Sequence, residues 1–598
     1  MLRPLDPASL RAIQRLHARL QSGDLMGALD GYDALPQASQ EHPSGLLLRG
    51  HILQAFGKLP EARQAYEQVL AAAPDNAAAL NSYGNLLDDL GESAAAVKAL
   101  ERATELSPDT NDYLINLGIV ATNADRFAVA EDAFARAIRS APAVARSWAA
   151  LAHLERRRGK IDTAVQLYRR AIELDPEDVR SRHNLATLLR EQDRPVEALE
   201  EVEAMRDLSV LPETAVLRAH LLGDLDRGDE AVAAYREVLQ SVPEQIDAQE
   251  TLARLLPQLG RGGEALHAYR EALRARPQSP LLWGSALRSA FALRDYVQLA
   301  AWAREAEAAI GPYPEVRIAG AAALSRLGDQ VEAIAILRRV LTDAPENGSA
   351  HQHLAHCLLA NGDAHAAESH ALRASQIEPL NQAPWALLTV IWRVLNDPRE
   401  HWLADYERLV MPIDLDAAPG FFDELGGRLT ELHTTREHPA DQSLRGGTQT
   451  RGHLFGRKDP LIERLTAQIR NGVLNRLRQL PDDPTHPFLS RRSAEISFAG
   501  SWSVRLRSEG FHISHIHQEG WISSALYVSL PPEMGQGEAG ALAFGIPDAA
   551  LGLDLRPRRV ERPQVGRLVI FPSYMWHGTL PFESAQPRLT VAFDAVPA

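Results

Sequence analysis

The sequence is poor in cysteine, in basic charge and in long apolar runs. Cys357 is the one cysteine among 598 residues, so an internal disulfide and a Cys-x-x-Cys zinc pair are both excluded. The net charge of −15 at pH 7 argues against nucleic-acid binding, which needs a basic face. No stretch approaches the roughly 18 uncharged apolar residues of a membrane helix, and no apolar signal segment follows the N-terminus. These absences predict a cytoplasmic protein that binds neither nucleic acid nor membrane.

Alanine and proline recur every 34 residues through the first two thirds of the chain. The alanines stand at Ala28, Ala62, Ala96, Ala130, Ala164 and Ala198, and the series continues at Ala231, Ala265, Ala333 and Ala367. The prolines stand at Pro74, Pro108, Pro142, Pro176, Pro243, Pro277, Pro345 and Pro379. A period held for so long indicates an array of structural repeats.

Residues 77–110 show what one repeat contains. Apolar residues at helical spacing predict a first helix, Gly91 breaks the chain at a turn, and a second helix follows. Pro108 ends that second helix because proline cannot continue the hydrogen-bond ladder. Gly84 and Ala96 are small at the positions where the two helices must approach closely. This pattern resembles the tetratricopeptide repeat, which implies a superhelix of helix pairs with a concave groove.

We expect the repeats to form one domain over residues 1–397. About eleven units fit between residues 9 and 395, and two of them, near 179–212 and 280–314, are degenerate. The groove of such a solenoid usually binds a protein or peptide, so we expect a partner of that class. The alternative is a spacer or dimerisation arm without a ligand. The oligomeric state is left open.

The composition changes after about residue 398. The pattern of residues 459–478 still predicts an amphipathic helix. The sequence beyond them is rich in Gly, Ser and Trp, and its apolar and polar residues alternate as in strands. The predicted strands cover residues 494–498, 502–507, 521–529, 541–544, 567–571 and 589–593. This pattern predicts a second domain over residues 398–598, with an antiparallel sandwich or barrel at its core and flanking helices.

Three histidines and an arginine stand in a suggestive order in this second domain. His515 and His517 are two residues apart, so on an extended chain both side chains face the same side. His577 ends a later strand, and Arg588 and Thr590 open the last one. A non-haem iron centre needs protein ligands on one face and open positions on the other. An arginine suits the far carboxylate of a dicarboxylate co-substrate because its planar fork makes two hydrogen bonds.

A family resemblance covers roughly residues 400–598. The matching segments are residues 441–455, 515–517, 520–527, 571–579 and 588–594. They resemble the 2-oxoglutarate/Fe(II) oxygenases that are attached to tetratricopeptide repeats. The resemblance implies a double-stranded β-helix (jelly-roll) fold, Fe(II), and oxidation coupled to decarboxylation of 2-oxoglutarate to succinate. It implies nothing about the substrate.

The third iron ligand departs from the usual family pattern of His-x-Asp or His-x-Glu, because His517 stands where the carboxylate is expected. Three interpretations follow. The iron is held by His515, His517 and His577; or Glu519 is the carboxylate in register with His517, and His515 lies behind the ligands; or two histidines bind and water completes the site. The three-histidine set is our first choice, with Glu519 as the alternative ligand.

The remaining predictions concern the co-substrate and the reaction. Arg588, Thr590 and Tyr527 are the expected 2-oxoglutarate contacts, and no further catalytic residue is predicted. No phosphate loop or nucleophile elbow is present, and a β-rich C-terminal region excludes a nucleotide-sugar transferase. We therefore expect an Fe(II)- and 2-oxoglutarate-dependent oxygenase that hydroxylates a protein or peptide recruited by the solenoid. The alternatives are a binding scaffold with an inactive oxygenase-like domain and an oxygenase of small molecules or glycans.

Overall fold

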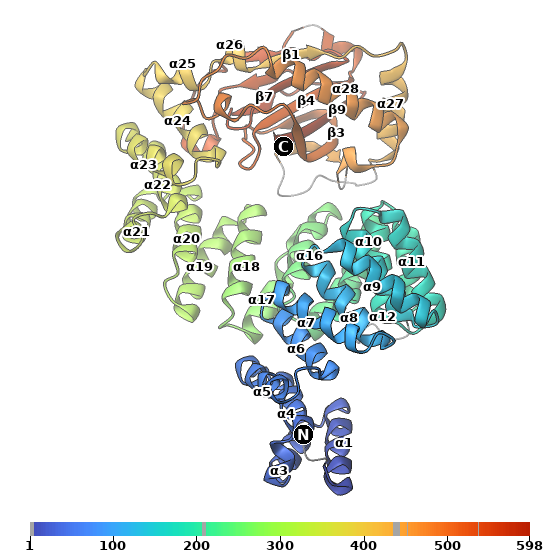
Figure 1. Cartoon of the computed structure of the whole chain (residues 1–598). Helices are drawn as coiled ribbons and strands as arrows, with labels where there is room; N and C mark the ends of the chain where they lie inside the picture. The colour runs from blue at the N-terminus through green and yellow to red at the C-terminus, as the bar shows by residue number, and fades with distance from the viewer. Residues whose placement is uncertain (1–4, 206–210, 434–442, 451–452, 536) are drawn as a thin grey trace. The chain divides into compact units, whose positions relative to one another are not determined.

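The fold is known from a computed structural model of the 598-residue chain (Figure 1). It describes residues 5–205, 211–433, 443–450, 453–535 and 537–598. Parts of the 441–455 segment, including Asp441 and Gly452, lie outside these described residues. The chain divides into two compact units, residues 1–211 and 212–598, and each is described by itself.

The first unit consists of antiparallel helix pairs stacked in chain order. The helices are α1 (Pro7–Gln21), α2 (Leu25–Asp33), the short α3 (Gln37–Gln40), α4 (Pro43–Ala55), α5 (Leu59–Ala72), α6 (Ala77–Asp89), α7 (Ser93–Leu106), α8 (Asn111–Asn123), α9 (Phe127–Ser140), α10 (Ala145–Arg157), α11 (Ile161–Leu174), α12 (Val179–Glu191) and α13 (Pro195–Glu203). The repeat alanines are buried without exception here, as Ala62 and Ala96 show. A Cβ on Gly84 would lie 2.6 Å from Leu100 Cγ, which explains the glycine where α6 meets α7.

The second unit begins with further helix pairs and carries the C-terminal domain. Its repeat helices are α14 (Pro212–Asp224), α15 (Gly228–Ser241), α16 (Ile246–Gln258), η2 (Gly262–Glu264), α17 (His267–Ala275), α18 (Pro280–Ala292), α19 (Tyr296–Ile310), α20 (Pro314–Arg326), α21 (Gln330–Asp343), α22 (Gly348–Ala360), α23 (Ala364–Ile377) and α24 (Gln382–Leu395). The predicted domain boundary, between residues 397 and 398, falls in the turn that follows α24.

The C-terminal domain is built on two antiparallel sheets, as in a jelly roll. The larger sheet has the order β1 (Met411–Asp414), β7 (Arg567–Pro572), β4 (Ile522–Ser529), β9 (Arg588–Pro597), β3 (Ile496–His512) and β2 (Leu444–Gln449). The smaller sheet has the order β6 (Arg559–Glu561), β5 (Leu542–Phe544) and β8 (His577–Thr579). An α solenoid followed by an antiparallel β domain confirms the predicted fold class.

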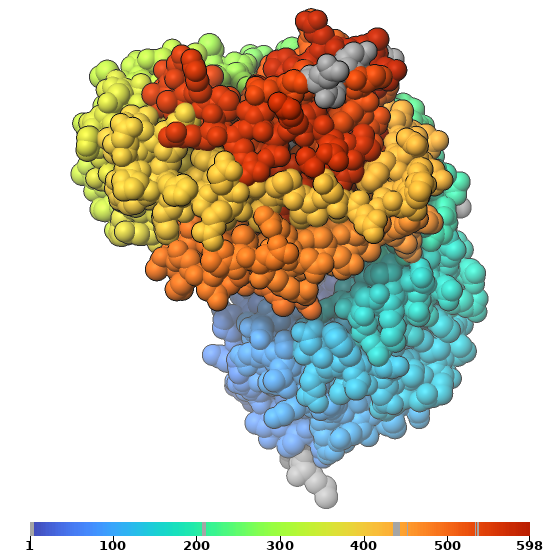
Figure 2. Space-filling view, turned by 90° about the horizontal axis from the view of Figure 1, so that it is seen from above, coloured from blue at the N-terminus to red at the C-terminus, as the bar shows by residue number. Residues whose placement is uncertain are grey.

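Helices flank the sheets and join the domain to the last repeats. They are α25 (Arg399–Leu403), α26 (Tyr406–Leu409), α27 (Phe421–Glu431) and α28 (Pro460–Leu477), with short turns η3 (Leu454–Gly456), η4 (Leu489–Arg491), η5 (Pro532–Gly535) and η6 (Ala549–Leu551). Figure 2 shows the yellow residues that follow the repeats lying against the orange and red residues of the β domain. The observed α28 confirms the helix predicted over residues 459–478.

The last repeat helix contributes directly to the core of the β domain. Trp576 Nε1 donates to the carbonyl of Ala386 in α24 at 3.0 Å, and the Gln382 amide donates to the carbonyl of Gln518 at 3.1 Å. Arg326 in α20 pairs with Asp548 at 2.6 Å. These contacts make the final repeats and the β domain one packed body.

Two expectations about this domain need correction or completion. The strands predicted over 494–498 and 502–507 are a single strand, β3, because the sheet absorbs Gly500 in a register shift between Phe498 and Gly500. The prediction of a break at that glycine was therefore wrong. Within the described residues, no helix is both long enough and apolar enough to cross a membrane.

Candidate metal centre

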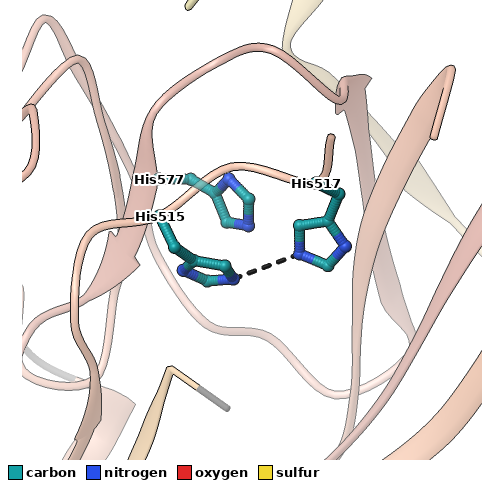
Figure 3. A group of neighbouring side chains, drawn as sticks. All are labelled: His515, His517 and His577. Atoms are coloured by element: carbon teal, nitrogen blue, oxygen red, sulfur yellow. Dashed lines mark hydrogen bonds between the residues drawn. The ribbon is translucent and has the colours of Figure 1, made fainter. Parts of the chain in front are cut away.

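Three histidines from two segments converge between the sheets (Figure 3). His515 and His517 follow the end of β3, and His577 is the first residue of β8. The backbone holds the segments together, since the His515 amide donates to the His577 carbonyl at 2.9 Å and the His577 amide donates back at 3.1 Å. The ligand nitrogens of the three side chains all lie within 4.8 Å of one another. These two backbone hydrogen bonds bring His515 and His577 together, although they lie far apart in the sequence.

The tautomer of each imidazole is set by what its Nδ1 contacts. Nδ1 of His515 lies 2.9 Å from the Ile513 carbonyl, and Nδ1 of His577 lies 2.9 Å from the Met575 carbonyl. A carbonyl oxygen only accepts, so each Nδ1 carries the proton and each Nε2 keeps its lone pair. The third histidine, His517, places its Nε2 3.1 Å from that of His515.

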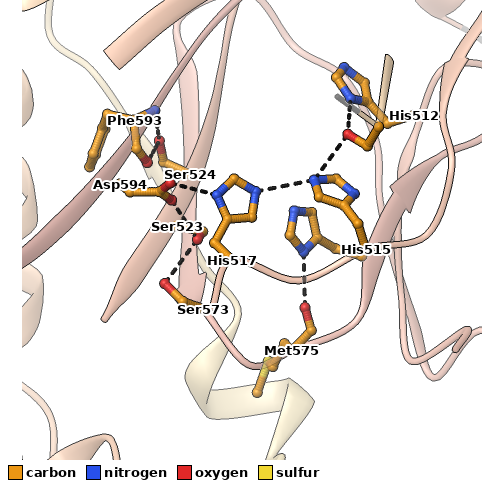
Figure 4. Close-up of polar contacts among 11 residues, drawn as sticks. His512, His515, His517, Ser523, Ser524, Ser573, Met575, Phe593 and Asp594 are labelled. Atoms are coloured by element: carbon orange, nitrogen blue, oxygen red, sulfur yellow. Dashed lines mark hydrogen bonds and ion pairs between the residues drawn. The ribbon is translucent and has the colours of Figure 1, made fainter. Parts of the chain in front are cut away.

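A carboxylate stands directly behind His517 (Figure 4). His517 Nδ1 donates to Asp594 Oδ2 at 2.5 Å, which leaves the Nε2 lone pair facing the other histidines. The second oxygen of Asp594 accepts from Ser523 Oγ at 2.7 Å, and Ser573 Oγ lies 2.9 Å from Ser523 Oγ. Asp594 is therefore held on both oxygens, and a carboxylate in this position orients a ligating histidine and raises its basicity.

Burial keeps His515 and His577 uncharged. Burial, followed by the charge of His517, lowers the pKa of His515 to about 3. Burial also lowers the pKa of His577 well below its ordinary value, and His515 adds to the effect. Metal binding requires neutral imidazole, so these two side chains are in the ligating form at neutral pH.

Arg588 is a buried cation without hydrogen-bond partners for two of its nitrogens. It is 2% exposed, and its Nε and Nη1 atoms are buried and unpaired. Its Cζ lies 5.0 Å from the centre of the Tyr527 ring. Burial lowers the pKa of Arg588, while the Tyr527 hydroxyl opposes this shift. Leaving donors of a buried charge unpaired is costly, so the arrangement favours an anionic ligand.

The histidines and Arg588 line one cavity of about 500 Å³. Thr590, two residues after Arg588 on β9, lines it as well, and its hydroxyl lies 3.5 Å from the Val504 carbonyl. Tyr527 does not reach the cavity surface; its buried hydroxyl is unpaired behind Arg588. The cavity thus combines a three-nitrogen cluster with a cation and a hydroxyl.

The alternative ligand Glu519 lines the same cavity but is exposed and lies outside the cluster of ligand nitrogens. On a fully extended chain His512 would point away from His515, but the structure brings the two rings together. The His512 ring stacks at 6.0 Å from that of His515, and Ser443 Oγ contacts both rings. The reason is that β3 ends at His512, so strand alternation does not continue to His515.

Two side chains that matter here escaped sequence reasoning. Ser443 lies in a segment with no chemical signature of its own. Asp594 is visible as the last residue of the 588–594 motif, but its partner His517 stands far away in sequence. The register of β9 against β4, which pairs Ser523 with Asp594, was the information needed.

Comparisons with known proteins agree with both halves of this description. A family model described as "Putative 2OG-Fe(II) oxygenase" matches residues 500–594. Tetratricopeptide-repeat models match residues 47–96, 84–145, 145–188, 216–280 and 325–391. Both resemblances seen in the sequence are thereby confirmed. No curated protein matches the chain.

Several solved structures are similar in part. MamA is 24% identical over 26% of this chain and 91% of its own, with a TM-score of 0.24. A tetratricopeptide repeat protein from Parabacteroides merdae is 20% identical over 39% of this chain and 93% of its own, with a TM-score of 0.32. YrrB, described as a repeat protein with an unusual peptide-binding site, is 19% identical over 29% and 91%, with a TM-score of 0.25.

Proposed function

We propose that this chain, in which tetratricopeptide repeats precede a domain matched by the 2OG-Fe(II) oxygenase family, is an Fe(II)- and 2-oxoglutarate-dependent oxygenase acting on a protein or peptide. One observation carries the proposal. A cluster of three imidazoles and an unpaired buried arginine line the same cavity. A metal ion would bind the imidazoles, and a carboxylate of 2-oxoglutarate would pair with the arginine.

The residues present fit a metal ion. Nδ1 of His515 and Nδ1 of His517 each contact an oxygen acceptor, and their Nε2 atoms lie 3.1 Å apart. Both Nε2 atoms therefore point into the space that they share with His577, and a cation there would be bound by both. We assign His515, His517 and His577 as the ligands, because Glu519 is exposed and outside the cluster.

The residues also fit the co-substrate. The unpaired Nε and Nη1 of Arg588 are the donors that a carboxylate accepts through two parallel bonds. The Thr590 hydroxyl lies on the same strand and lines the same cavity, so it adds a donor. Tyr527 does not line the cavity, but its ring packs against Arg588 and supports the guanidinium.

The chemistry follows from these roles. Bound Fe(II) supplies the activation of dioxygen, coupled to decarboxylation of 2-oxoglutarate to succinate. The chain itself orients the ligands, with Asp594 holding the tautomer of His517 and the Met575 and Ile513 carbonyls holding those of His577 and His515. Arg588 would fix the co-substrate at one end.

The assignment of a macromolecular substrate is supported by how the repeats meet the β domain. Helix α24 is hydrogen-bonded to the residue beside His577, through Trp576 and Ala386. A groove built by the repeats would therefore present its ligand next to the histidines and raise its local concentration there. Deleting residues 1–395 would also remove part of the β domain's core, so substrate class is better tested with point variants.

The test is succinate release by the full chain supplied with Fe(II), 2-oxoglutarate and air, beside a His577→Ala variant. Uncoupled turnover does not require the true substrate. Succinate that depends on His577 would support the oxygenase. Binding of Fe(II) and 2-oxoglutarate is measured by anaerobic equilibrium titration. If neither bound, the proposal of an oxygenase would give way to that of a binding scaffold with an inactive oxygenase-like domain.

A further inference from the structure

One turn of the repeat array departs from all the others. The second residue after the first helix of each pair adopts a left-handed backbone conformation, which side chains other than Gly, Asn and Asp rarely adopt. Glycine occupies this position at Gly23, Gly57, Gly91, Gly159, Gly260, Gly328 and Gly362, and aspartate at Asp125, Asp193 and Asp226. Arg294, with a φ of 59°, is the exception in the described residues.

Arg294 is also the repeat residue that lines the cavity of the metal centre. It joins α18 to α19, and it lies on the wall of the 500 Å³ cavity that contains the three histidines and Arg588. The other turn positions of the described repeats are absent from that wall. A long side chain held in a strained conformation at a cavity mouth indicates a functional requirement.

A second cavity lies between this turn, the repeats that follow it and the segment that contains His515. It has a volume of about 290 Å³ and shares Arg294, His515, Ile516 and Gln518 with the first. The first helices of four successive repeats contribute side chains to it: Phe291 from α18, Arg326 from α20, His353 from α22 and Leu387 from α24. Since neighbouring helices pack about 10 Å apart, a ligand reaching all four is elongated, on the order of eight or nine extended residues.

Within the described part of the chain, no carboxylate lies within ion-pair distance of the exposed Arg294. The pKa of Arg445 is lowered by burial and then by the positive charge of Arg294. Arg326 is already paired with Asp548. Glu519, an exposed carboxylate on the cavity wall, makes no ion pair with Arg294.

We propose that Arg294 binds an aspartate or glutamate side chain of an extended substrate peptide lying between the last repeats and the β domain. This inference rests on the proposed function, because only that function makes the bound peptide a substrate. The binding itself does not require iron. Arginine pairs with a carboxylate through two hydrogen bonds, which would fix the register of the peptide relative to the histidines. The acidic residue then determines which neighbouring residue reaches the metal.

The experiment measures peptide binding to the metal-free full chain by fluorescence anisotropy. The probes are labelled nine-residue peptide pools that differ only in a fixed central Asp, Glu, Asn, Gln or Lys. We expect the Asp and Glu pools to bind at least tenfold more tightly than the Asn and Gln pools. Arg294→Gly should abolish this difference, and Arg294→Lys should retain most of it.

Two matched variants isolate the role of Arg294. Arg274→Gln removes one positive charge from an exposed arginine on α17 that lines neither cavity, and it should leave the acidic preference unchanged. Arg588→Met removes the buried arginine, and the preference should survive this change too. Loss of the preference in Arg588→Met but not in Arg294→Gly would overturn the proposal.

The remaining outcomes are also decisive. Equal affinity for all pools, or no binding by any pool, rules the acidic peptide out. Displacement of the peptides by an equal concentration of N-acetyl-aspartate amide would mean that a small carboxylate is the ligand instead. Succinate release is measured separately and without peptide, so the two proposals can fail independently. A preference for acidic peptides without succinate release would contradict the oxygenase and support this inference. Succinate release without a preference for acidic peptides would contradict this inference alone.

Discussion

Asp594 accepts a hydrogen bond from His517, with 2.5 Å between Oδ2 and Nδ1. The family pattern usually provides a carboxylate as a direct metal ligand. In this chain the carboxylate of Asp594 instead contacts the far side of the His517 imidazole, away from the other histidines. A negative group next to Nδ1–H makes Nε2 a stronger donor to a metal. The centre therefore keeps the influence of a carboxylate although all three assigned ligands are neutral.

The first prediction tests that relationship. Asp594→Ala should weaken Fe(II) binding by roughly 10- to 100-fold, the usual cost of losing such a partner, and Asp594→Asn should weaken it less because the amide oxygen still accepts from His517. Anaerobic equilibrium titration with Fe(II) measures both. The control is Ser524→Ala, which loses a bond to the Phe593 carbonyl without touching a histidine. Equal affinities for wild type and Asp594→Ala would show that the hydrogen bond from His517 to Asp594 does not affect metal binding.

The second prediction concerns the unpaired guanidinium. Arg588→Met should abolish 2-oxoglutarate binding yet raise the free energy of unfolding by roughly 1–3 kcal/mol, because it removes buried donors that have no partners. Calorimetric titration and urea unfolding of the same protein measure the two effects. Arg567→Met is the matched comparison on β7. Arg567 pairs with Asp414 at 2.8 Å, so this variant should be slightly less stable and bind normally. A destabilised Arg588→Met would mean that Arg588 is satisfied within the fold.

The third prediction is a loss of stability in acid. Burial, followed by the charge of Arg326, lowers the pKa of His353 and of His356 to about 4, whereas an unfolded histidine titrates near 6.5. Between these values the unfolded state binds more protons, so the contribution is complete above pH 6.5 and is lost as the pH falls towards 4.

The measurement is the free energy of urea unfolding at pH 7 and at pH 4. The double variant His353→Gln, His356→Gln should lose about 1–2 kcal/mol less between the two values than wild type, after a discount for partial exposure. His365→Gln, on an exposed position of α23, should follow wild type. A double variant with the wild-type pH dependence would show that other groups dominate the acid transition.

The sequence was sufficient for whatever local periodicity or spacing encodes. The 34-residue rhythm of Ala62 and Ala96 predicted the helix pairs, because each alanine marks a place where two helices touch. The order of His515, His577 and Arg588 predicted which side chains share a cavity. Pairing between distant segments was not encoded locally, so the bond between His517 and Asp594 and the true direction of His512 required the fold. Arg294 is an intermediate case, since an arginine at a position otherwise held by glycine or aspartate is visible in the repeat alignment itself.

The last prediction follows from that arginine. The left-handed conformation costs a side chain with a Cβ about 1 kcal/mol relative to glycine, so Arg294→Gly should make the second unit more stable by roughly that amount, although it removes a side chain from the cavity wall. The mirror variant is Gly328→Arg at the next turn. An added Cβ there meets no atom within 4 Å, and the φ is 93°, so the backbone alone should lower stability by a similar amount. Urea unfolding of both variants measures the two changes in stability.

If Arg294→Gly were destabilising, Arg294 would hold the turn together, and its conformation would need no functional explanation. If it is stabilising, the chain keeps a less stable turn at the one place in the described repeats where a long cation reaches the metal centre.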